Sequence, residues 1–206
     1  MNFIDLFAGA GGLSEGFIRA GFTPVAHVEM DSAACYTLRT RMAYHHLAKQ
    51  GRLDIYHSYL SREISRRDLY SHIPESVFNS IINQAISEEN NSAIFAQIDE
   101  LLDGQEVDLI IGGPPCQAYS NIGRAALKHV KDDHRKKLYV EYGKFLKRYK
   151  PKVFVFENVP GLKSSDTGIH YQNIKEYFDK IGYHVEEKQL NARSFGVVQD
   201  RSEERR

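Results

Sequence analysis

The stretch NFIDLFAGAGGLSEGFIRAGFTPVAHVEM, residues 2–30, carries the strongest structural signal in this sequence. An apolar run over residues 2–7 leads into a glycine-rich turn, and residues 13–20 then place Leu13, Phe17 and Ile18 on one face of a helix. Gly21 ends that helix, and residues 24–30 form a second strand-like run. Strand, glycine turn, helix and strand within about 30 residues make a βαβ unit, which predicts a parallel sheet with a right-handed crossover.

The same pattern returns later in the chain. Residues 107–111 and 152–158 are apolar runs of the buried parallel-strand type. Helices are predicted at 137–149 and 171–181, and residues 183–190 alternate like a later strand. The sequence therefore predicts an α/β fold: a Rossmann-like, mostly parallel sheet with helices on both faces.

The region between the two halves of this pattern differs from them. Leu69, Ile73, Val77, Ile81 and Ala85 recur every four residues, which is typical of an amphipathic helix. We therefore predict a helical insertion at about residues 50–91 within a single domain, serving as a packing elaboration without a function of its own.

Composition narrows the class of protein. The 206 residues include 27 lysines and arginines and 27 acids, so the formal net charge is zero. A protein that binds nucleic acid over its whole surface would be expected to carry a net positive charge. No apolar run approaches the roughly 20 residues of a membrane span, and the N-terminus resembles no export signal. Two cysteines favour a cytoplasmic location, and the nine histidines lack CxxC or HExxH spacing, so we expect no metal site.

The first glycine turn is a candidate ligand site. Gly9, Gly11 and Gly12 fill it, and Glu29 ends the next strand, where an acid would meet ribose hydroxyls. Ser14 replaces the third glycine of the dinucleotide fingerprint, so a cofactor without a pyrophosphate, such as S-adenosylmethionine, fits better. The alternative is a tight turn beside a solvated carboxylate.

A cysteine and a glutamate follow the two later strands. Cys116 comes after Pro114 and Pro115, whereas Cys35 lies in a predicted helix and is expected in the core. Glu157 ends the next strand, and adjacent parallel strands would bring both residues to one crevice, although a lone glutamate is more often an ion-pair partner.

Three stretches, DLFAGAGGLSEGF (5–17), GGPPCQAYS (112–120) and FENVPGL (156–162), resemble in order and spacing the motifs of cytosine-5 DNA methyltransferases. The resemblance implies S-adenosylmethionine as cofactor, Cys116 as nucleophile and Glu157 as the acid. It also implies that the cofactor is contacted by Phe7, Gly9, Gly11, Gly12, Glu29, Met30 and Pro115. DNA would be contacted by Gln117, Ser120, Asn158 and Gln199, and Arg201 would take part in catalysis.

The implied chemistry is nucleophilic catalysis with acid assistance. The Cys116 thiolate would add to carbon 6 of a cytosine flipped from DNA, while Glu157 hydrogen bonds or protonates ring nitrogen 3. Carbon 5 then takes the sulfonium methyl group, loses its proton and eliminates the cysteine. The basic segment 121–137 would close over the flipped nucleotide.

The sequence also departs from the family pattern. Glu203 stands where the family has a second arginine after Gln199 and Arg201, and we expect the family's recognition domain and final strands to be absent. Asp99 is one candidate for the family's acid near adenine. A restriction-modification enzyme that needs a second polypeptide is therefore expected, with an inactive remnant, a non-enzymatic S-adenosylmethionine-binding module or a tRNA cytosine-5 methyltransferase as alternatives.

Overall fold

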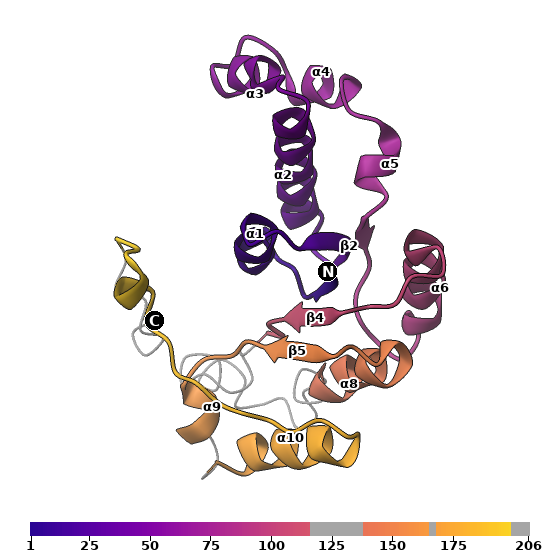
Figure 1. Ribbon diagram of the computed structural model, residues 1–206, viewed down its shortest axis with the longest axis vertical. Helices are drawn as coiled ribbons and strands as arrows, with labels where there is room; N and C mark the ends of the chain where they lie inside the picture. The colour runs from indigo at the N-terminus through magenta and orange to yellow at the C-terminus, as the bar shows by residue number, and fades with distance from the viewer. Residues whose placement is uncertain (116–137, 165–167, 199–206) are drawn as a thin grey trace, which may run out of the picture. The chain divides into compact units, whose positions relative to one another are not determined.

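The structure, a computed structural model, describes residues 1–115, 138–164 and 168–198 (Figure 1). It divides into two compact units. The sheet unit comprises Met1–Gly112 with Pro151–Val155, and the C-terminal unit comprises Gly113–Lys150 with Phe156–Arg206.

Five strands form one sheet in the order β3-β2-β1-β4-β5. Their bounds are β1 Asn2–Leu6, β2 Thr23–Glu29, β3 Ile81–Asn83, β4 Leu109–Gly112 and β5 Val153–Phe156. β1 pairs in parallel with β2 and β4, and β2 pairs in parallel with β3. The predicted α/β fold with a mostly parallel sheet is thus confirmed. The chain winds outward from β1 to β3 and then returns to β4 on the other side, so the order reverses between β1 and β4, where open α/β sheets bind ligands.

β1 is the central strand, and Phe3, Ile4, Asp5 and Leu6 are all buried. Its register with β2 shifts once, from Phe3 opposite Pro24 to Ile4 opposite Ala26, which skips one residue of β2. Proline has no N–H to give to the ladder, so a bulge beside it is the arrangement that keeps the rest of the strand paired.

Helices cover both faces of the sheet. α1 (Gly12–Arg19) packs Leu13, Phe17 and Ile18 against a buried cluster of Phe3, Leu109 and Ile111. α2 (Ser32–Lys49) lies beside α1, and α6 (Asn91–Leu102) lies on the other side of the strands (Figure 1). Helices thus lie on both faces of the sheet, as the sequence predicted.

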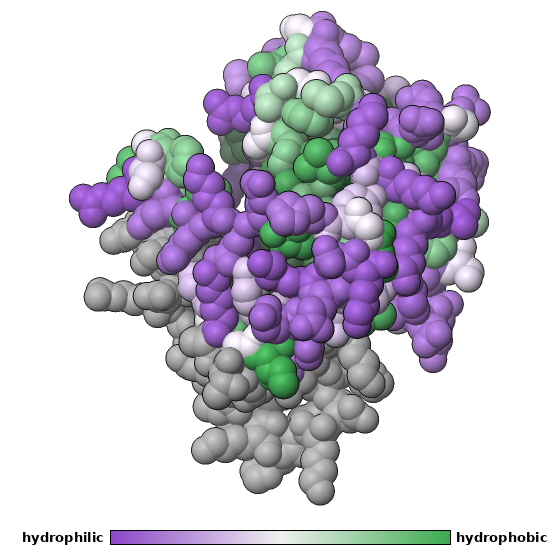
Figure 2. All heavy atoms as spheres, turned by 60° about the horizontal axis from the view of Figure 1, so that its bottom comes forward, coloured by the Kyte–Doolittle hydropathy of each residue, from purple (hydrophilic) through white to green (hydrophobic). Residues whose placement is uncertain are grey.

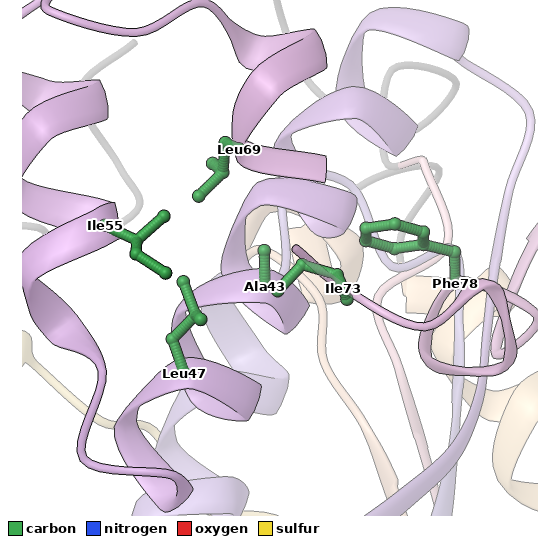
Figure 3. Packing of buried hydrophobic residues seen from close by; sticks show 6 residues of the cluster. All are labelled: Ala43, Leu47, Ile55, Leu69, Ile73 and Phe78. Atoms are coloured by element: carbon green, nitrogen blue, oxygen red, sulfur yellow. The ribbon is translucent and has the colours of Figure 1, made fainter. Parts of the chain in front are cut away.

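The predicted insertion is built of three short helices, α3 (Leu53–Leu60), α4 (Arg66–Ser71) and α5 (Glu75–Phe78). They bury one apolar cluster against α2 (Figure 3), made of Ala43, Leu47, Ile55, Leu69, Ile73 and Phe78. The single helix inferred from the spacing of Leu69 to Ala85 is wrong, because the chain turns after Phe78 and Ile81 begins β3. Ile82 is buried there by the sheet, so tertiary packing overrides the helical period.

The C-terminal unit contains α8 (Leu138–Tyr149), α9 (Gly161–Ser164), α10 (Ile169–Lys180) and the 3₁₀ turn Ala192–Phe195. The rings of Tyr142, Phe156 and Phe178 meet edge to face at its centre. The strand predicted over residues 183–190 is wrong, since this segment has no regular structure and pairs with no described strand.

The surface is ordinary for a folded domain. Hydrophilic side chains predominate on the face in Figure 2, with apolar ones between them. Among the described residues, no helix is both long and apolar enough to span a bilayer.

Candidate active site

The glycine turn between β1 and α1 uses backbone conformations that most residues avoid. Gly9 and Gly11 have φ of 54° and 80°, and Phe7 adopts 57°, a strained value for a residue with a side chain. A Cβ at Gly11 would lie 2.8 Å from Cδ2 of Leu38 and 3.2 Å from Cδ of Arg41. A Cβ at Gly9 or Gly12 would meet nothing within 4 Å. The turn is therefore packed against α2 on one side and open on the other, where a ligand can reach its backbone.

Side chains from α2 and α1 hold this turn in place. Arg41 donates from Nε to the carbonyl oxygen of Ala10 at 2.7 Å, and its Nη1 lies 3.2 Å from Oε2 of Glu15. His45 Nε2 lies 3.0 Å from the same carboxylate oxygen. These contacts fix the turn before any ligand binds.

Glu29 joins the ends of β1 and β2. Its Oε2 accepts a hydrogen bond from the Gly9 N–H at 2.7 Å, and its Oε1 accepts one from the Asp31 N–H at 2.8 Å. A carboxylate has about four lone-pair sites, so hydroxyl donors can still be accepted. The neighbouring Met30 side chain is 68% exposed. Both predicted cofactor residues thus lie at the carboxyl edge of the sheet, while their contacts with a cofactor stay a prediction.

A buried polar pair, which the sequence reading missed, lies on the same two strands. Asp5 and His27 are register partners, each 1% exposed, with Oδ2 and Nδ1 3.5 Å apart. Burial raises the pKa of the Asp5 carboxyl, and the nearby His27 and Ser14 oppose that shift only in part. The sequence signal was an acid and a histidine inside two apolar runs.

The predicted acid belongs to the C-terminal unit. Glu157 directly follows β5, and a Cβ built at Gly113 would come within 2.5 Å of its Oε2. The carboxyl group thus occupies the space that glycine leaves. Asn158 accepts the Val159 N–H on its side-chain oxygen at 2.9 Å. Pro114 is buried and Pro115 exposed.

Several predicted residues lie outside the described part of the chain: Cys116, Gln117, Ser120, Gln199, Arg201 and the basic segment 121–137. Their roles stay predictions. Cys35, in contrast, is buried on α2, and burial together with the charges of Glu29 and Asp31 raises the pKa of its thiol, as expected for an unreactive core cysteine.

Asp99 lies on α6 and in none of the turns that follow β1, β2 and β3. At the end of β3 the chain instead has Asn83, a residue that the sequence reading did not select.

A cavity of about 560 Å³ is lined by Asn2, Thr23, Ser80 and Asp108, which stand at the starts of strands. It therefore lies at the opposite edge of the sheet from the candidate site.

A Rossmann-like parallel sheet with an open glycine turn and strand-end acids belongs to the class of open α/β folds that bind ligands at the carboxyl ends of their strands. Within that class, the model of the C-5 cytosine-specific DNA methylase family matches residues 1–65 and 74–203. The chain belongs to this family.

Curated relatives agree with this assignment. The chain is 40% identical over 206 residues to the type II methyltransferase M.Bpa9945I of Bacillus paralicheniformis, covering 90% of this chain and 46% of that protein. It is 34% identical to M1.HphI of Haemophilus parahaemolyticus (98% and 44%) and 33% identical to M.AquIA of Picosynechococcus (96% and 67%). The chain therefore spans just under half the length of the first two relatives.

Proposed function

We propose that this chain forms the cofactor-binding and catalytic part of a DNA cytosine-5 methyltransferase of a restriction-modification system. The observation that carries the proposal is the Glu157 carboxyl beside Gly113, three residues before Cys116, in a chain of this family. The type II methyltransferase names of the relatives support DNA as the substrate.

The residues present fit S-adenosylmethionine. The side of the turn left open at Gly9 and Gly12 admits a ligand to the backbone, and Glu29 offers a carboxylate at the strand ends for ribose hydroxyls. Met30 presents an exposed apolar side chain next to Glu29, suited to the face of an adenine. When bound, the cofactor supplies an electrophilic methyl group.

The protein's own groups would perform the remaining steps. Cys116 as thiolate adds to carbon 6 of cytosine, and Glu157 donates a hydrogen bond or proton to ring nitrogen 3, so that electron density moves to carbon 5. After methylation, loss of the carbon 5 proton lets the C–S bond break and restores the thiolate. Gln117, Ser120, Asn158, Gln199 and Arg201 are proposed to hold the flipped nucleotide, and Pro115 to border the cofactor.

DNA sequence reading requires more than these residues. Because the chain spans 46% of M.Bpa9945I, we propose that recognition is provided by further sequence, in the same or in a second polypeptide.

Covalent trapping tests the reaction class. Duplex DNA with 5-fluorocytosine, S-adenosylmethionine and the complementing part of a relative should give an adduct that Cys116→Ala abolishes and Glu157→Gln slows by about a hundredfold. An equivalent RNA serves as the second arm, and an adduct with RNA alone would assign a tRNA-type substrate. Binding of S-adenosylmethionine without an adduct on either DNA or RNA would favour a non-enzymatic cofactor-binding module.

A further inference from the structure

Asn83, the last residue of β3, uses its whole side-chain amide to hold the end of β2. Its Nδ2 donates to the carbonyl oxygens of Glu29 and Met30, at 3.0 Å each. Its Oδ1 accepts a hydrogen bond from Oγ of Ser32 at 2.9 Å. The side chain is exposed, so core packing does not explain these three bonds.

The segment held in this way carries two of the predicted cofactor residues, Glu29 at the end of β2 and Met30 directly after it. β3 has only three residues, and Glu29 opposite Asn83 is its last register pair with β2. Beyond that pair, the turn from Glu29 to Ser32 is linked to β3 through the Asn83 amide. Within the turn, Asp31 caps α2 by accepting the Ala34 N–H at 2.8 Å, and its own N–H binds Glu29.

We propose that Asn83 is a positioning residue for the adenosyl cofactor. By fixing the carbonyl groups of Glu29 and Met30, it sets the direction in which the Glu29 carboxylate meets the ribose. This inference rests on the proposed function.

The chemistry of the site demands an amide. One planar group must donate two hydrogen bonds and accept a third, which asparagine does and aspartate at neutral pH does not. An aspartate would also direct negative charge at two carbonyl oxygens and toward the Glu29 carboxylate, so the turn would move away from β3.

Calorimetric titration of the 206-residue protein with S-adenosylmethionine tests this role. Asn83→Asp keeps the shape and the bond to Ser32 but loses both donors, and its dissociation constant should rise by about 10- to 30-fold, as for two lost hydrogen bonds. Ser32→Ala is the matched control, since it removes only the third bond, and it should stay within about twofold.

A double-mutant cycle with Glu29→Gln separates positioning from general support. If Asn83 acts through Glu29, Asn83→Asp should cost much less affinity in the Glu29→Gln background. An equal loss of affinity in both backgrounds would overturn the inference. So would an Asn83→Asp variant that binds S-adenosylmethionine as tightly as the wild-type protein does. Wild-type protein that binds no cofactor, either alone or with the complementing part of a relative, would refute the proposed function as well.

Folding of the variants is followed by the melting temperature of the ligand-free protein. Asn83→Ala replaces Asn83→Asp if the latter does not fold, because it removes the donors without adding charge. A loss of affinity that only tracks a lower melting temperature would mark Asn83 as structural and refute the proposal.

Discussion

The turn after β1 and the segment after β4 leave two neighbouring parallel strands of one sheet, yet they are built for different tasks. Residues 7–12 are rich in glycine, and side chains such as Glu29 and Arg41 brace the turn. Residues 113–115 are one glycine and two prolines, which offer few donors but a restricted path. In the first segment glycine shapes the backbone, and in the second it makes room for the Glu157 carboxyl.

The largest effect should follow from placing a side chain in the first turn. Gly11→Ala puts a Cβ 2.8 Å from Leu38 Cδ2 at a φ of 80°, and the combined strain and overpacking should lower the free energy of unfolding by about 3 kcal/mol. Urea denaturation measures this. Gly16→Ala in α1, where a Cβ meets nothing within 4 Å, is the control and should be neutral or stabilising. Equal stability of the two variants would show that the turn tolerates rearrangement.

A glycine-to-alanine change in the segment after β4 should leave the free energy of unfolding unchanged and slow the covalent reaction. Gly113→Ala would push aside the Glu157 carboxyl, whose Oε2 lies 2.5 Å from the new Cβ, and misplacement by about 1 Å can cost roughly a hundredfold in rate. The trapping rate with 5-fluorocytosine DNA should fall to the level of Glu157→Gln, with cofactor affinity unchanged. Trapping at the wild-type rate would mean that the position of this carboxyl is unimportant.

The buried pair beneath the first turn gives a smaller effect, visible in the pH dependence. The raised pKa of Asp5 means that the folded state holds a proton which the unfolded state releases near pH 3.8, so this group's contribution to stability falls as pH rises from there through the folded pKa. Asp5→Asn has no titratable carboxyl at this position, so its stability does not fall with pH for this reason. The stability of the variant relative to wild type should therefore increase with pH, in unfolding curves from pH 4 to 8. A difference in stability between the variant and the wild type that does not change with pH would contradict the raised pKa of Asp5.

How far the sequence predicted the molecule depended on the kind of signal. The βαβ start was readable because glycine spacing, helical period and strand run all agree over residues 2–30. The α4–β3 region was not, because Ile81 continues the period of Leu69 and Ile73 although the chain has turned at residues 79–80. Asn83 was invisible for another reason: its role comes from bonds to residues more than 50 positions away, and no local pattern encodes these.

The smallest effect is expected at the surface of the C-terminal unit. The Tyr171 hydroxyl donates to the Glu187 carboxylate, which also pairs with Lys163, and this hydrogen bond raises the pKa of Tyr171 to about 12. Glu187→Gln should return that pKa toward its usual value of about 10, measured as tyrosinate absorbance during alkaline titration. Because the folded state retains the phenol proton longer, the stabilisation is complete below about pH 10 and is lost as pH rises through about 12. Such an exposed contact should leave stability at neutral pH and methyl transfer almost unchanged, in contrast to the change at Gly113 in the same unit.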